Sequence, residues 1–290
     1  LAQGDQVIQV VNELRDFWPL TLRQIYYRLV AAGYLENTRS RYNDLSKLIK
    51  HMRLDDWLPW EVLEDRSRRV SAKRGWSDKD EFIEAHMEAF LSGYERCYVQ
   101  DQERYVELWT EKDALMPVFE RVAYPYCIRA VLCRGYQSIT FKDAYRRRAQ
   151  AALSRGQVPV LLYFGDLDPS GWNMLEDIKQ CLEDEMDLYG VEYLRVALLP
   201  EQVQEFNLIH NPDALKHTDS RAKRYLRQFG HLAVELDALH PATLQEMAVQ
   251  AIEAQFDMEA FKEQREIEDI ERERLKDMKR HLLASLGRFD

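Results

Sequence analysis

VPVLLYFGDLDPSG, residues 158–171, opens with seven residues that form an almost continuous apolar run. Such a run is typical of a strand that is buried on both faces of a parallel sheet. Asp166 and Asp168 follow at the end of the run, just before a Pro-Ser-Gly turn into a helix. In an extended backbone these two side chains share one face, and Leu167 points into the core. The segment therefore predicts a buried strand that ends in two neighbouring carboxylates.

The sequence around this strand alternates between strand and helix patterns. Strands are expected at 104–110, 127–135, 158–166 and 193–199, with helices at 113–123, 138–156 and 170–190 between them. This alternation predicts a parallel, Rossmann-like α/β sheet with helices on both faces. In such sheets functional groups collect at the carboxyl ends of the strands. Glu111, directly after the first expected strand, is therefore expected near Asp166 and Asp168.

Both ends of the chain show helical patterns. Residues 5–75 contain three short helical patterns with tight turns, which indicate a helix-turn-helix or winged-helix module, although any small helical bundle would look similar. Residues 241–290 indicate a C-terminal helical extension whose last helix is charged, with sparse apolar positions. The expected domains are a winged-helix-like domain over 1–75, a connector over 76–103, the sheet domain and its extension over 104–240, and C-terminal helices over 241–290.

The 290-residue chain carries a formal net charge of −10, which argues against a protein that coats nucleic acid by bulk electrostatics. The charge is unevenly distributed, with 13 Lys+Arg against 10 Asp+Glu in residues 1–75 and 27 against 40 in the remainder. We expect the densest basic cluster to contact DNA phosphates, and the alternative is a solvated helix end or linker. This cluster comprises Arg66, Arg68, Arg69, Lys73 and Arg74.

Cysteine usage and hydropathy bear on location. The four cysteines form no CxxC pair and have no His at zinc-finger spacing, so we expect reduced thiols and no structural zinc. No apolar run is long enough to cross a bilayer, and the first residues lack the pattern of a secretory signal. We expect a cytoplasmic, nucleoid-associated protein without a membrane partner.

The acidic residues at the strand ends suit metal chemistry. Asp166 and Asp168 are expected to bind Mg²⁺ or Mn²⁺, because hard cations prefer carboxylate oxygens and Mg²⁺ keeps waters for a substrate phosphate. Glu111 supplies a third acidic group, able to bind the metal or move a proton. The alternative for the Asp-x-Asp pair alone is a turn and helix N-cap, since Asp caps helices well. The acidic residue after the first strand, the apolar run and the following Gly together favour the metal site.

Two stretches of the sequence, around Glu111 and around Asp166 and Asp168, resemble the Toprim domain shared by topoisomerases, bacterial primases and some nucleases. The matching stretches are VELWTEKDAL, which contains Glu111, and VLLYFGDLDPSG, which contains Asp166 and Asp168. The resemblance covers roughly residues 104–200. It implies Mg²⁺-dependent breaking or joining of phosphodiester bonds, with Glu111 as the acid/base candidate and the aspartates as metal ligands.

Upstream, TLRQIYYRLV resembles a motif of the topoisomerase VI A subunit and the related meiotic double-strand-break transesterase. That family carries Arg-x-Ile-(Tyr/Phe)-Tyr on a winged-helix domain ahead of its Toprim domain. The matching residues are Arg23, Ile25, Tyr26 and Tyr27, and RGYQS at 134–138 also looks like a segment of that family. The resemblance implies that Tyr27 attacks DNA, that Arg23 contacts the phosphate or the transition state, and that a homodimer completes the site. The chain is shorter than the usual A subunit of that family.

Several functions are compatible with these residues. The first is DNA cleavage by transesterification through Tyr27, and the second is a hydrolytic nuclease that uses metal-activated water. The third is a non-catalytic DNA-binding subunit, in which Tyr26 and Tyr27 are ordinary helix residues. No GxxxxGK[ST] loop is present, so strand passage would need a separate ATPase subunit. For Glu235 and Asp237 we expect a structural role, with a further metal ligand as the alternative.

Overall fold

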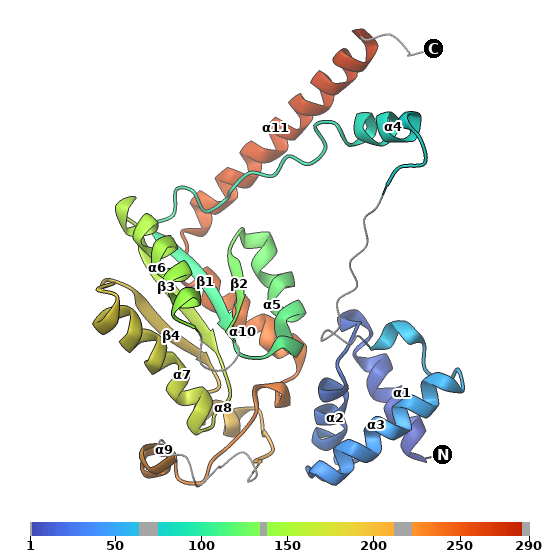
Figure 1. Ribbon diagram of the computed structural model, residues 1–290, viewed down its shortest axis with the longest axis vertical. Helices are drawn as coiled ribbons and strands as arrows, with labels where there is room; N and C mark the ends of the chain where they lie inside the picture. Colours follow the sequence, from blue (N-terminus) through green and yellow to red (C-terminus); the bar gives the residue numbers. More distant parts are fainter. Residues whose placement is uncertain (1, 64–74, 134–137, 212–221, 286–290) are drawn as a thin grey trace. The chain divides into compact units, whose positions relative to one another are not determined.

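The computed structural model describes residues 2–63, 75–133, 138–211 and 222–285 (Figure 1). The chain divides into two compact units. The larger one comprises Leu1–Asp65 and Glu103–Gln255, and the smaller one comprises Arg66–Gln102 and Phe256–Asp290. Among the helices described, none combines the length and the apolar character that a membrane span requires.

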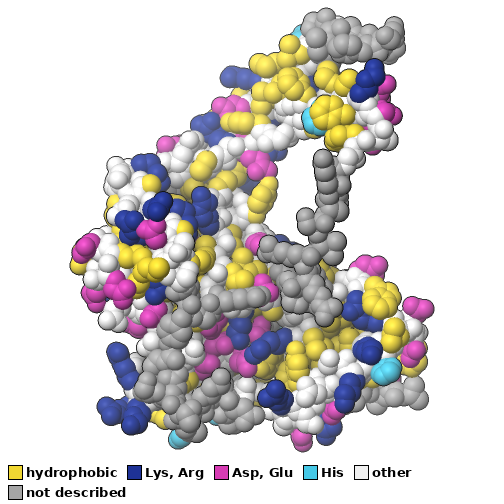
Figure 2. All heavy atoms as spheres, in the orientation of Figure 1, with side chains coloured by type: hydrophobic (Ala, Val, Ile, Leu, Met, Phe, Trp, Pro, Cys, Tyr) yellow, Lys and Arg dark blue, Asp and Glu magenta, His cyan; other side chains and the backbone are white. Residues whose placement is uncertain are grey.

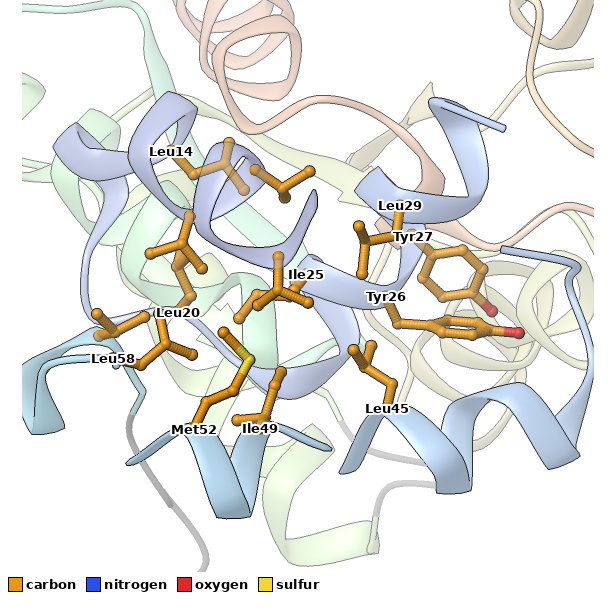
Figure 3. Packing of buried hydrophobic residues seen from close by; sticks show 14 of the residues in the cluster. Leu14, Leu20, Ile25, Tyr26, Tyr27, Leu29, Leu45, Ile49, Met52 and Leu58 are labelled. Atoms are coloured by element: carbon orange, nitrogen blue, oxygen red, sulfur yellow. The ribbon is translucent and has the colours of Figure 1, made fainter. Parts of the chain in front are cut away.

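Three helices begin the larger unit, as the sequence predicted: α1 (Ala2–Glu13), α2 (Leu22–Ala31) and α3 (Arg39–Leu54). Thr21 starts α2 with a capping box, in which its side chain and that of Gln24 each accept from the other residue's backbone N–H. Thr38 is the N-cap of α3, and its side chain accepts a hydrogen bond from the Arg41 backbone N–H. The helices share an apolar core, part of which Figure 3 shows around Ile25.

The sheet of the larger unit has four parallel strands, which confirms the predicted α/β pattern. They are β1 (Arg104–Thr110), β2 (Arg129–Leu132), β3 (Val158–Phe164) and β4 (Glu192–Ala197). Their order in the sheet is β2-β1-β3-β4, so the two strands that precede the predicted carboxylates are direct neighbours. Trp109 pairs with Tyr163 and Thr110 with Phe164, which brings the carboxyl ends of β1 and β3 level with each other.

Helices cover both faces of this sheet, and side chains alternate between the two along each strand. On one face, Trp109 meets Tyr145 at 5.1 Å between ring centroids, and on the other Phe164 meets Phe119 at 4.7 Å. The first face packs against α6 (Ile139–Ser154) and α7 (Pro169–Gln180), and the second against α5 (Met116–Ala123) and α10 (Pro241–Glu253) (Figure 1). This unit also contains α8 (Pro200–Glu205) and α9 (Ala222–Phe229).

A buried carboxylate lies in the middle of β1. The Glu107 side chain is fully buried, and Arg148 of α6 donates to both of its oxygens, from Nε at 2.6 Å and from a terminal nitrogen at 2.9 Å. Tyr105 and Trp109 donate to the same carboxylate. This network satisfies a charge inside the sheet layer, so it is a structural feature of the fold.

Polar contacts, together with a ring contact between Tyr98 and Phe261, join the two segments of the smaller unit. Its helices are α4 (Lys79–Ala89), which lies in the segment expected as a connector, and α11 (Met258–Ser285), the expected charged helix. Arg96 binds Glu271, Gln264 and Glu268 of α11, two of them through its side chain and Glu268 through its backbone N–H. Helix α4 buries none of its residues, and Figure 2 shows hydrophobic side chains at the surface over α4 and the end of α11.

Candidate functional site

The three carboxylates predicted from the strand ends come together at the carboxyl edge of β1 and β3. Glu111 Oε1 accepts a hydrogen bond from the backbone N–H of Asp166 at 2.6 Å. Asp168 is the N-cap of α7, where its Oδ1 accepts from the Gly171 N–H at 2.6 Å. The metal and capping interpretations of Asp168 are therefore compatible, because a cap uses only one of its two oxygens.

Gly171 makes this approach possible. A Cβ at position 171 would lie 2.6 Å from the backbone oxygen of Asp166 and 2.8 Å from Glu111 Oε1. Any larger residue would therefore push Glu111 away from the turn that follows β3. The glycine after Asp-x-Asp is thus part of the site and not only of the turn.

Burial and mutual repulsion shape the acidity of these groups. Desolvation and the nearby Asp166 charge raise the pKa of Glu111 to about 7. Burial, together with the Asp166 charge, also raises the pKa of Asp168. Glu111 can therefore hold or release a proton near neutral pH, as an acid/base group must.

The raised pKa of Glu111 predicts a pH dependence of stability. A carboxyl whose pKa is higher in the folded state stabilises the fold fully below its unfolded pKa, and that stabilisation is lost as pH rises through about 7. We expect the free energy of unfolding of the wild type to fall relative to Glu111→Gln by on the order of 2 kcal/mol between pH 4.5 and 8. Urea unfolding at a series of pH values, without divalent metal, measures this difference, and parallel curves for the two proteins would contradict it.

A second acidic segment, residues 234–237 with Glu235 and Asp237, docks on the turn after β3. Leu167 and Val234 exchange two backbone hydrogen bonds, at 2.9 and 3.0 Å, and Asp166 Oδ1 accepts from the Leu236 N–H at 2.8 Å. These bonds place Glu235 and Asp237 beside the strand-end carboxylates. The two residues for which sequence offered a structural or a ligand role therefore lie inside the candidate site.

Lys112 lies among these acids. Its Nζ is 2.7 Å from Asp166 Oδ2, 3.3 Å from Glu235 Oε2 and 3.5 Å from Asp237 Oδ2. Burial alone would lower the pKa of Lys112, but the carboxylates outweigh it and the pKa is raised above the usual value for lysine. The site therefore contains a permanent internal cation.

Helix α2 brings the predicted arginine and tyrosine to the same place. Arg23 forms ion pairs with Glu235 and, at 2.9 Å from its Nε, with Asp237 Oδ2. Its guanidinium carbon lies 5.7 Å from the centroid of the Tyr27 ring. Arg23 and Tyr27 thus meet the acidic groups within one chain, although the resemblance implied completion by a second protomer.

The two adjacent tyrosines have different surroundings. Figure 3 shows them side by side at one edge of the apolar cluster, with both hydroxyls pointing away from it. The Tyr26 hydroxyl donates to the Thr38 backbone oxygen at 3.0 Å and is also close to Asn37. Tyr27 is only 7% exposed, and burial raises its pKa to about 12 although Arg23 acts in the opposite direction. Tyr26 therefore has a structural role in the bundle, whereas the Tyr27 phenol faces the charged groups.

A pocket of about 320 Å³ opens beside these groups. Its walls come from α2, from the start of α3 and from the acidic segment. The lining residues are Arg23, Tyr26, Tyr27, Asn37, Thr38, Arg39, Tyr42, Asn211 and Glu235. The arginine and the tyrosine predicted to act on a phosphate therefore line the same pocket.

Arg195 of β4 is a further member of the site. It donates to the backbone oxygens of Leu198 and Gly171, both at 3.0 Å, and to those of Gly165 and Asp166. Sequence reasoning missed it because its partners are backbone oxygens, most of them in the turn after β3 and the start of α7, which no side-chain pattern reports. An arginine inside the edge strand β4, two residues before its end, is the signal that was present.

The side-chain oxygens at this site are of the type and charge that a divalent cation prefers as ligands. All are carboxylate oxygens, and both oxygens of Asp237 are buried without a hydrogen-bond partner among the described residues, although Arg23 pairs with one of them. No set of three or more His, Cys, Asp or Glu side chains in the described part of the chain is already grouped for a metal. Mg²⁺ or Mn²⁺ held by Glu111, Asp166 and Asp168 would have to compete with Lys112 for Asp166.

The predicted DNA-binding cluster cannot be assigned a place. Arg66, Arg68, Arg69, Lys73 and Arg74 lie outside the described residues.

Comparison of the chain with models of protein families, with curated proteins and with solved structures finds no match.

Proposed function

We propose that this protein cleaves DNA by transesterification through Tyr27, at a Mg²⁺ site of the Toprim type. In this proposal the N-terminal helices act as a winged-helix-like domain and the parallel sheet as a Toprim domain. The observation that carries it is that α2 contacts the acidic segment around Glu235 and Asp237, which is itself docked on the turn after β3. Arg23 pairs with Glu235 and Asp237, and Lys112 connects these acids to Asp166.

Each residue has a distinct role in the proposed reaction. The Tyr27 oxygen forms a bond to phosphorus while the bond from phosphorus to the leaving sugar oxygen breaks, which leaves the protein joined to one DNA end and a hydroxyl on the other. Arg23 and Lys112 both favour loss of the phenolic proton, because each lowers the pKa of Tyr27. Arg23 also stabilises the charge that develops on the phosphoryl oxygens.

Glu111 supplies the proton transfer. In the metal-free site its pKa is about 7, and a bound cation would lower this pKa, so Glu111 is suited to accept a proton during attack and return it to the leaving sugar oxygen when it is not itself coordinated. A Mg²⁺ ion bound by Glu111, Asp166 and Asp168 would supply Lewis-acid stabilisation of the phosphate and fix its orientation. Lys112 and Arg195 hold the carboxylates and the backbone of the turn in position.

A hydrolytic nuclease is the second candidate. It is favoured by the burial of Tyr27 and by its pKa of about 12, which keep the phenol neutral at physiological pH. In that mechanism activated water attacks phosphorus and Tyr27 only positions the backbone. The resemblance further suggests a homodimer that acts on DNA in the cytoplasm, with a separate ATPase subunit if strands are passed.

Incubation with supercoiled plasmid and Mg²⁺ or Mn²⁺ tests the proposed function. The reaction is stopped with detergent, and half of each sample is treated with protease before electrophoresis. Transesterification predicts DNA ends that enter the gel normally only after protease treatment. Free ends in both halves would support hydrolysis instead, and plasmid that is shifted but uncut would contradict both mechanisms.

Asp168→Asn tests the metal site with little structural disturbance. Asn caps helices about as well as Asp, so α7 should keep its N-terminal hydrogen bond while the site loses one negative charge. We expect cleavage to be at least about tenfold slower and to require more Mg²⁺. Asp78→Asn is the matched control, because Asp78 caps α4 in the other unit and should leave the rate unchanged. Wild-type cleavage by Asp168→Asn would rule Asp168 out as a ligand.

A further inference from the structure

One face of α3 carries cations and no acid. Arg39, Asn43, Ser46, Lys50 and Arg53 follow one another at spacings of three and four residues, so they form one stripe along the helix. The first four are exposed and Arg53 is half-buried. We call these five residues the cationic stripe, and it spans about 21 Å of helix.

The acidic residues near the cationic stripe lie off this face. Asp44 follows Asn43 directly and therefore points about 100° away around the helix. Asp55 and Asp56 belong to the turn after the helix. Figure 2 shows Lys and Arg side chains spread over the surface of the N-terminal helices, next to hydrophobic ones. A polyanion could therefore follow the five residues of the stripe without meeting a carboxylate between them, although Glu61 lies next to Trp60 at one end and Glu235 in the pocket at the other.

An aromatic groove adjoins one end of the cationic stripe. Its volume is about 500 Å³, within the range of pockets that hold small ligands. Trp60 forms part of its wall and is 53% exposed, and the guanidinium carbon of Arg53 lies over one face of the indole, 4.4 Å from the ring centroid. The groove is lined by Leu22, Ser46, Ile49, Lys50, Arg53, Leu54, Trp60 and Leu63. An exposed indole beside cations is a common arrangement in proteins that bind single-stranded nucleic acid.

The other end of the cationic stripe reaches the candidate site. Arg39 lines the pocket that also contains Arg23 and Tyr27. The stripe therefore runs from the Trp60 groove to the residues proposed to act on a phosphate. A strand that lay along it would enter that pocket.

We propose that the cationic stripe and Trp60 bind a single nucleic-acid strand, with phosphates on Arg39, Lys50 and Arg53 and an unstacked base against the indole. The identity of the ligand rests on the proposed function, whereas the surface does not. An unstacked base is required because the bases of a closed duplex cover one another's faces, so they offer none to an indole in this position. The cations read the phosphate backbone, which carries no base sequence, so binding is not sequence-specific.

Binding to the full chain is measured by fluorescence anisotropy with a labelled DNA strand of about 12 nucleotides and with the same sequence as a duplex. EDTA is present throughout, so cleavage does not contribute, and the salt concentration is varied. Lys50→Gln is the main variant, because Lys50 is exposed and makes no ion pair among the described residues. Arg41→Gln is the matched control, since Arg41 is on the same helix but about 200° from Arg39, with Glu36 nearby.

We expect Lys50→Gln to weaken single-strand binding about fivefold and to lower the slope of log K against log salt by about 0.7. Trp60→Leu should weaken single-strand binding at least about fivefold and leave this slope unchanged, because stacking releases no counterion. Arg41→Gln should bind as the wild type does.

Unchanged binding by Lys50→Gln, or equal losses in Lys50→Gln and Arg41→Gln, would overturn the proposal. Tighter binding of the duplex together with no effect of Trp60→Leu would overturn it as well, by removing the single strand as the ligand. In either case plasmid cleavage by the wild type would leave the proposed function intact. Conversely, failure of cleavage would not alter a binding result obtained in EDTA.

Discussion

Tyr27→Phe is expected to abolish plasmid cleavage and protein-linked DNA ends while leaving stability unchanged. Phenylalanine keeps the ring, so packing against the α2 core and the contact with Arg23 should survive. The hydroxyl has no hydrogen-bond partner among the described residues, so its loss leaves none unsatisfied. The loss of activity should be complete, because Tyr27 is the proposed nucleophile and the hydroxyl of the adjacent Tyr26 is held by the Thr38 backbone oxygen. Detergent-stopped plasmid assays and thermal unfolding measure the two effects.

Tyr26→Phe is the control, because the two tyrosines are adjacent and the two variants are expected to have opposite effects on cleavage and on stability. Its hydroxyl donates to the Thr38 backbone oxygen, so the variant should lose about 1 kcal/mol of stability. Cleavage should continue at close to the wild-type rate, because that hydroxyl is bound to the α3 start and does not face the acids. If Tyr27→Phe still cuts DNA while Asp168→Asn does not, the nucleophile is water and the hydrolytic mechanism replaces transesterification.

Arg148→Ala should cause the largest loss of stability among these variants, about 3–5 kcal/mol. The reason is that Glu107 has no exposed surface, so the variant would leave its carboxyl group inside the sheet layer without the guanidinium that pairs with it. Denaturant unfolding measures the change. Arg147→Ala is a matched control, because that side chain is 75% exposed and pairs only with Asp143 at the surface, so its loss should cost less than about 1 kcal/mol.

A double variant distinguishes the buried charge from simple loss of packing. Glu107→Gln combined with Arg148→Ala removes the charge that Arg148→Ala leaves unpaired, so it should be more stable than Arg148→Ala alone. If Arg148→Ala unfolds at the wild-type denaturant concentration, the Glu107 pair contributes nothing measurable. If the double variant is the less stable of the two, packing and not charge explains the loss.

The fold was predictable where the pattern is local. The apolar run at 158–164 identified β3, because a strand covered on both faces carries few polar residues, and shorter strand-forming patterns identified the other three strands. The order β2-β1-β3-β4 was not predictable, since it depends on which strands pair across long sequence separations. The contacts of Arg96 with α11 also escaped detection, because periodicity reports buried apolar faces and this packing is polar.

The site was predictable in part for the same reason. Glu111, Asp166 and Asp168 could be grouped because the carboxyl ends of parallel neighbours share one edge. Lys112 stands beside Glu111 in the sequence, yet its carboxylate partner Glu235 is 123 residues away, so nothing local indicates that it is an internal counter-ion. The placement of Arg23 against Asp237 is likewise a tertiary contact. Residue type and position at a strand end are enough to predict candidate ligands, whereas ion pairs between residues far apart in the sequence become visible only in the three-dimensional structure.

The docking of the acidic segment on Leu167 also affects when the site can exist during synthesis. Proteins emerge from the ribosome from the N-terminus, and domains generally fold as units during this process. Arg23, Lys112 and Asp166 emerge well before Glu235 and Asp237, which lie near the end of the larger unit. A nascent chain that stops short of Val234 has the tyrosine and the strand ends but lacks the segment that pairs with them. A ribosome stalled before that point therefore holds a chain whose candidate site is still unassembled.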